Sequence, residues 1–155
     1  MHGNLKVLEQ LNAALKGELT TILQYIVHAE MCNNWGYQRM GGYLKKQAVE
    51  EMKHAEGLIE RILFLDGTPQ VEVMPGPKIG EDVKAQLDHD LAGEVAAIVQ
   101  YNRAVTVCSE AGDNATRALF ERMVADEERH ADYLESQLFM IGEVGLDNYL
   151  AQQIH

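Results

Sequence analysis

Apolar side chains recur every three or four residues along most of the chain, a spacing that places them on one face of an α-helix. The pattern predicts four long helices and a short fifth one, over residues 4–35, 38–65, 81–110, 113–141 and 147–153. Asp147 is the expected N-cap of the short helix, because its carboxylate can accept a hydrogen bond from a free amide of the first turn. The chain is therefore predicted to be all-α.

The main non-helical connection is predicted at residues 67–80, which contain all three prolines of the chain. Fully extended, this segment reaches about 46 Å, whereas a helix of the predicted length measures about 43 Å. The segment can therefore cross the whole bundle and leave the second and third helices parallel. We expect a single domain over residues 1–155, a four-helix bundle with one long crossover between helices 2 and 3 and a short fifth C-terminal helix.

Six polar residues interrupt the apolar stripes at positions that should face the core, namely Glu18, Glu51, His54, Glu94, Glu127 and His130. One constant offset in residue number superposes the first three on the last three, because 94 − 18, 127 − 51 and 130 − 54 are equal. This repeat offset also superposes several unlike residue types, including Leu11 on Leu87, Gln24 on Gln100, Tyr25 on Tyr101, Cys32 on Cys108 and Gly36 on Gly112. A single offset with so many matches indicates two related helical hairpins.

Two hairpins joined by a full-length crossover can be related by a twofold axis that brings the six polar residues together. The Glu-x-x-His spacing of Glu51 and His54 places carboxylate and imidazole on one helix face. Four buried carboxylates without partners would be very costly, whereas two divalent cations would balance their charge. Oxygen and imidazole donors without thiolates favour iron or manganese. The alternative is a buried network of hydrogen bonds without metal.

Composition excludes several other classes of protein. The net charge is −11 and the basic residues form no cluster, so no nucleic-acid partner is expected. Cys32 and Cys108 lack metal-site or disulfide-framework spacing. Neither a signal peptide nor a membrane span is recognisable, so a reducing cytoplasm is the expected location. The four remaining histidines are expected at the surface, namely His2, His28, His89 and His155.

The motifs resemble those of bacterioferritins over essentially the whole chain. The matching stretches are LNAALKGELTTILQY, NNWG, EEMKHAE, ERILFLDGTP, IGEDV, DEERHADYLESQL and GLDNYLAQQI. The resemblance implies a ferritin-like fold and a ferroxidase that oxidises Fe²⁺ with O2 or H2O2 and stores ferric mineral inside a shell of 24 chains. It assigns the six polar residues as ligands of two iron ions, with Glu51 and Glu127 bridging both ions. Glu18 with His54, and Glu94 with His130, would complete one ion each.

The resemblance also implies a second cofactor and several partners. Met52 lies about 100° around its helix from Glu51 and matches a methionine that binds haem b between two subunits, one sulfur from each chain. Apolar side chains expected around that haem are Leu19, Ile22, Leu23, Ile26 and Ile59. Tyr25 is a candidate electron donor, or else a core tyrosine with one hydrogen bond. A small ferredoxin electron donor and a second bacterioferritin subunit type are implied as partners.

Two other functions remain open on the sequence. One is a di-iron or di-manganese redox enzyme of the rubrerythrin or catalase sort, without mineral storage. The absence of a rubredoxin-like cysteine module and of long insertions argues against it. The other is a haem-carrying electron-transfer dimer whose metal site is only structural.

Overall fold

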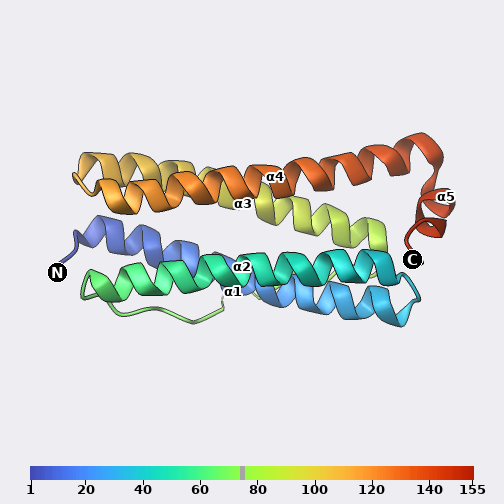
Figure 1. Ribbon diagram of the computed structural model, residues 1–155, viewed down its shortest axis with the longest axis horizontal. Coiled ribbons are helices and arrows are strands. Elements are labelled where there is room, and N and C mark those ends of the chain that lie inside the picture. Colours follow the sequence, from blue (N-terminus) through green and yellow to red (C-terminus); the bar gives the residue numbers. More distant parts are fainter. Residues whose placement is uncertain (74–75) are drawn as a thin grey trace.

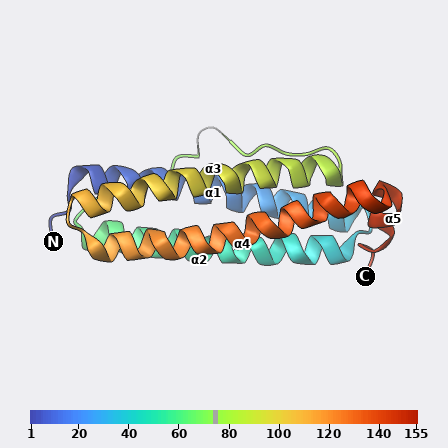
Figure 2. The ribbon, with the colours of Figure 1, turned by 90° about the horizontal axis from the view of Figure 1, so that it is seen from above.

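The computed structural model describes residues 1–73 and 76–155 and contains four long helices and one short one (Figure 1). Their bounds are α1 Leu5–Asn34, α2 Gln38–Phe64, α3 Val83–Glu110, α4 Asn114–Val144 and α5 Leu146–Ala151. Helices α2 and α3 run in the same direction, and the chain between them returns along the length of the bundle (Figures 1 and 2). The predicted all-α bundle with one long crossover is therefore confirmed.

Helix ends follow local capping chemistry. The Asn4 side chain accepts from the amides of Lys6 and Val7 at the start of α1, and Asp82 and Asp113 cap α3 and α4 in the same way. Asp147 is not an N-cap, and this prediction was wrong. Gly145 holds the position between α4 and α5 with φ +85°, a conformation that favours glycine, and Asp147 lies in the first turn of α5.

The crossover, defined as residues 67–80, is fastened to α1 at three points within its described residues. The amide of Gln70 donates to Asn12 (2.8 Å), that of Lys78 donates to Gln24 (2.9 Å) and that of Gly80 donates to Nε2 of His28 (3.0 Å). A loop that lies against a helix must satisfy its own backbone donors, and these side chains do so. Of the three prolines in the predicted connection, Pro75 lies outside the described residues.

His28 is fully buried, so its predicted surface position was wrong. Its Nδ1 lies 3.0 Å from an Asp90 oxygen, which also accepts from Nε2 of Gln24 (2.9 Å). Because Nε2 accepts the Gly80 amide, the proton must sit on Nδ1 and point at Asp90. The repeat offset places Ala104 and Ala14 at the positions that match His28 and Asp90. The internal repeat therefore does not extend to this pair.

The apolar core consists of two clusters that lie on either side of a polar layer. One includes Leu11, Leu58 and Phe120, and the other includes Leu44 and Leu134. Both cysteines are buried and free. Among the described residues, no helix is long and apolar enough to cross a membrane.

Candidate metal centre

The polar layer between the two apolar clusters contains the six residues singled out from the sequence. Helices α1 and α3 supply one glutamate each, and helices α2 and α4 supply a glutamate and a histidine each, namely Glu18, Glu94, Glu51 with His54, and Glu127 with His130. None of the six is more than 9% exposed. Each i, i+3 pair shares the inward face of its helix because three residues are close to one helical turn.

The six residues form two overlapping groups of possible ligands. Atoms of Glu18, Glu51, His54 and Glu127 lie within 4.8 Å of one another, and so do atoms of Glu51, Glu94, Glu127 and His130. We call these the His54 group and the His130 group. Glu51 and Glu127 belong to both groups, whereas Glu18 and Glu94 belong to one each. Two ions bound here would therefore share two carboxylates.

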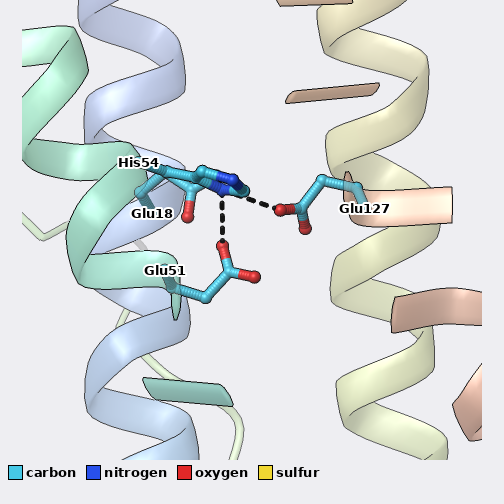
Figure 3. Close-up of side chains that lie close together, drawn as sticks. All are labelled: Glu18, Glu51, His54 and Glu127. Atoms are coloured by element: carbon cyan, nitrogen blue, oxygen red, sulfur yellow. Dashed lines mark ion pairs between the residues drawn. The ribbon is translucent and has the colours of Figure 1, made fainter. Parts of the chain in front are cut away.

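Both histidines direct Nδ1 at the carboxylates. Nδ1 of His54 lies 3.0 Å from Glu127, 3.4 Å from Glu51 and 3.5 Å from Glu18 (Figure 3). Nδ1 of His130 lies 2.9 Å from Glu51, 3.7 Å from Glu94 and 3.8 Å from Glu127. The same ring atom faces the centre in both halves, as expected for two hairpins related by a twofold axis.

The crowded charges shift the pKa values of these groups strongly. Burial, and then the neighbouring Glu51, raise the pKa of Glu18 well above its usual range. Burial, and then the nearby carboxylate of Glu94, raise the pKa of Glu127 to about 12. Burial also raises the pKa of Glu51, but its close contacts with Glu18, His130 and His54 outweigh burial and hold that pKa below normal. Without a cation, protons must therefore neutralise part of the layer.

Both histidines have pKa values above normal. Burial lowers the pKa of His54, but its close contacts with the carboxylates of Glu127, Glu18 and Glu51 reverse this effect. For His130, close contacts with the carboxylates of Glu51 and Glu94 likewise outweigh burial and raise the pKa to about 9. The raised pKa values favour a proton on each imidazole, whose positive charge offsets part of the carboxylate charge that a metal ion would otherwise balance.

Several buried polar atoms of this layer have no hydrogen-bond partner in the described part of the chain. They are Oε2 of Glu18, both oxygens of Glu51, Oε2 of Glu94, Oε1 of Glu127 and Nδ1 of His54 and His130. Buried polar atoms in native proteins nearly always have partners, so a cluster of orphans at one place calls for a bound group. The atoms are the oxygens and imidazole nitrogens that suit iron or manganese. The residues therefore fit a pair of divalent cations.

Each of the two glutamates that belong to only one ligand group accepts a hydrogen bond from a tyrosine. Tyr25 of α1 donates to Glu94 of α3 (2.6 Å), and Tyr101 of α3 donates to Glu18 of α1. Tyr25 was predicted as a site residue from the sequence, whereas Tyr101 was not. The signal was present, because the repeat offset superposes the two tyrosines. Tyr25 has the single hydrogen bond of a core tyrosine, and this geometry is equally compatible with a role as electron donor.

Asp126 is a second residue of the site that was not predicted from the sequence. Its Oδ2 lies 2.9 Å from Nε2 of His54, on the side of the ring that faces away from the other carboxylates, and its Oδ1 accepts from Arg129 (2.7 Å). Only its place directly before Glu127 could have indicated this role.

Met52 lies outside the polar layer. Its side chain is 45% exposed on α2, and Leu23 and Ile26 of α1 are also exposed, whereas Leu19, Ile22 and Ile59 pack partly against the core. An exposed thioether is available to a group that is shared with a second copy of the chain. A methionine sulfur is an axial ligand of haem in other proteins, so these residues fit half of a haem site.

Comparison with known proteins gives consistent matches. Residues 8–141 match a protein family described as "Ferritin-like domain". The chain is 40% identical to the bacterioferritin of Mycolicibacterium paratuberculosis over 152 residues, which cover 98% of this chain and 96% of that protein. It is 40% identical to the bacterioferritin of Brucella melitensis over 149 residues (96% and 92%). It is 42% identical to that of Rhodobacter capsulatus over 145 residues (94% and 90%).

Proposed function

Because the chain belongs to the ferritin-like family, and within it to the bacterioferritins, we propose that it stores iron and oxidises Fe²⁺ at the buried polar layer. The observation that carries this proposal is the pair of overlapping ligand groups with orphaned donor atoms. Two Fe²⁺ ions are the substrate. Each ion gives up one electron, and the two electrons reduce H2O2 to water or O2 to H2O2, with the protons supplied by solvent.

The protein's contribution is to hold the two ions close together in a dry, anionic site. Glu51 and Glu127 would contact both ions, because they alone belong to both groups. Glu18 and His54 would hold one ion, and Glu94 and His130 the other. Carboxylates are hard donors that stabilise Fe³⁺ more than Fe²⁺, so the site lowers the free energy of the oxidised state.

We further propose that Met52 of each of two chains binds haem b at a subunit interface. Bound there, haem would supply a route for electrons that reduce stored Fe³⁺ to soluble Fe²⁺. The chain's own contribution is the sulfur ligand and the apolar surface of α1 and α2. A small ferredoxin is the proposed source of these electrons. The proposed assembly is a shell of 24 chains, with a second bacterioferritin subunit type as a further candidate partner.

Replacement of Glu18 and Glu94 by glutamine tests the catalytic role of the layer. The change keeps side-chain size but removes one charged ligand from each group. We expect rapid Fe²⁺ oxidation, followed by the absorbance of the ferric product, to fall by 100-fold or more, on the order of the loss expected for an essential ligand. The matched control is E9Q together with E110Q, which changes two exposed glutamates on the same two helices.

Survival of rapid oxidation in E18Q/E94Q, with normal folding by circular dichroism, would show that the layer is not the ferroxidase. Turnover of peroxide by the unmodified protein without retention of iron would favour the di-metal redox enzyme. An iron-free dimer that carries haem and exchanges electrons would favour the electron-transfer function.

A further inference from the structure

The two histidines of the polar layer differ in the contact made by Nε2, the ring nitrogen that faces away from the glutamates. Nε2 of His54 lies 2.9 Å from Oδ2 of Asp126, and Oδ1 of the same aspartate accepts from Arg129 at 2.7 Å. Asp126 therefore lies between a buried imidazole and an exposed guanidinium. We call this chain of two contacts the Asp126 clamp.

The clamp fixes which nitrogen of His54 can bind a cation. Asp126 is held as an acceptor, so a neutral His54 must carry its proton on Nε2 and donate it there. The lone pair then sits on Nδ1, which faces Glu18, Glu51 and Glu127 (Figure 3). A carboxylate on the far side of a metal-binding imidazole also raises its basicity and fixes its orientation. Loss of a proton from His54 therefore leaves the lone pair on the nitrogen that faces the carboxylates, where a cation would bind.

His130 has no corresponding contact among the described residues. The repeat offset places Glu50 and Lys53 of α2 where α4 has Asp126 and Arg129. Glu50 is half-buried and Lys53 is exposed, and no hydrogen bond joins either side chain to His130 within the described part of the chain. The two halves therefore have equivalent inner ligands but different outer contacts.

We propose that the two ion sites are unequal, that the His54 group binds the first divalent cation more tightly, and that Asp126 is the positioning residue responsible. This inference rests on the proposed metal site and deepens it. Loss of such an outer contact changes metal affinity by about 10- to 100-fold in other proteins, which sets the expected difference between the two sites. Filling is then sequential, and the ion in the His130 group is the one that leaves first.

Titration of the assembled, iron-free protein with Co²⁺ tests the inference without any oxidation chemistry. The visible absorbance of bound Co²⁺ reports each ion as it enters the layer. We expect two steps whose dissociation constants differ by about tenfold or more. Two equal steps would overturn the inequality while leaving the metal site intact. No Co²⁺ binding would instead refute the metal site itself.

Single glutamine variants assign each step to a group, because Glu18 and Glu94 each belong to one group only. E94Q should keep the tight step and lose the weak one. E18Q should keep only the weak step. Retention of the tight step in E18Q, with its loss in E94Q, would reverse the assignment and overturn the proposal.

Variants of the clamp test its cause. D126A should weaken the tight step by about 10- to 100-fold and leave the weak step unchanged. D126N, which can still accept a hydrogen bond, should recover part of the loss. D132A removes an exposed carboxylate from the same helix and should change neither step. Equal weakening of both steps in D126A would mean that Asp126 acts only through overall charge or folding.

The repeat also allows the clamp to be installed on the other half. E50D/K53R gives α2 the two residues that α4 carries at the matching positions. We expect this variant to strengthen the weak step, so that the two dissociation constants approach each other. An unchanged weak step, in a protein that folds and assembles normally, would show that the absence of the clamp does not set the difference.

Discussion

Buried glutamates are the costly feature of this protein, and their arrangement shows how the cost is offset. Tyr101 donates a hydrogen bond to Glu18, and Tyr25 donates one to Glu94. Each of these two glutamates belongs to only one ligand group. The remaining carboxylate oxygens face histidine nitrogens or have no partner in the described chain. A side chain that would destabilise an ordinary core is here available as a ligand.

The pKa shifts predict that metal binding displaces protons. The pKa of Glu127 is about 12 and that of His130 is about 9, so both groups are protonated in the metal-free protein near pH 7. Cations must replace these protons, so affinity for Co²⁺ should rise with pH, on the order of tenfold per pH unit for each proton released. Co²⁺ titrations between about pH 6 and pH 8, with a pH indicator to count released protons, measure this. Affinity that did not change with pH would contradict the protonation states.

The two tyrosines are expected to donate electrons to the oxidant when too little Fe²⁺ is present to reduce it. Oxidation of a tyrosine releases its phenolic proton, and the glutamate that accepts the hydrogen bond can take it. Because Tyr25 and Tyr101 have equivalent bonds, we expect a tyrosyl radical signal in electron paramagnetic resonance to decrease in Y25F and in Y101F, and to vanish in the double variant. The control is Y37F at the start of α2. A full signal in the double variant would exclude both residues as donors.

At the scale of the elements, the crossover determines more than connectivity. It makes α2 and α3 parallel and supplies three amides that bind side chains of α1. Gly80 approaches the start of α3 so closely that a Cβ there would lie 2.3 Å from the backbone nitrogen of Gln86. The register between crossover and bundle therefore depends on a glycine and on buried side chains.

The buried His28–Asp90 pair gives a prediction about stability. H28A removes one of the two donors to the buried Asp90 oxygen and leaves the Gly80 amide without its partner, so it should lower the free energy of unfolding by about 1–3 kcal/mol. H28A/D90A should lower the free energy of unfolding by less than the sum of the two single changes, because it removes both partners together. The double variant also has alanine at both positions, as the repeat has at Ala104 and Ala14. Denaturant unfolding measures both quantities, with H89A as the control. Additive losses would show that the two side chains do not act as a pair.

For the whole molecule, exposed apolar side chains on α1 and α2 favour assembly. Leu23, Ile26, Leu63 and Phe64 are between 38% and 56% exposed, and Met52 is 45% exposed. Large apolar side chains left exposed on two helices are candidates for a contact between proteins.

Sedimentation velocity, recorded at protein and haem wavelengths together, tests the assembly. We expect a boundary near 24 × 17.3 kDa, about 415 kDa, that carries haem absorbance. M52L should keep the boundary and lose the haem, because leucine retains the apolar volume but lacks the sulfur ligand. M140L, another exposed methionine, is the control. A dimer-sized boundary after iron loading would contradict mineral storage, and haem retained by M52L would exclude Met52 as its ligand.

Helical periodicity determined the elements and much of the candidate site from the sequence alone. The i, i+3 spacing placed Glu51 with His54 on one face, and the repeat offset predicted that the four long helices form two related hairpins. These are local or repeated patterns, so they can be read without knowledge of the packing. They also placed the helix ends to within a few residues, with the largest error at α4, which continues to Val144.

Only the tertiary structure decided which side chains meet across the bundle. The contacts of His28 with Gly80 and of Asp126 with His54 join residues 52 and 72 positions apart. No periodicity encodes such pairs, because they depend on the path of the crossover and on the relative register of helices from different hairpins. The sequence thus determined that the six polar residues of the layer face the interior, whereas packing decided that His28 is buried and that Asp126 contacts His54.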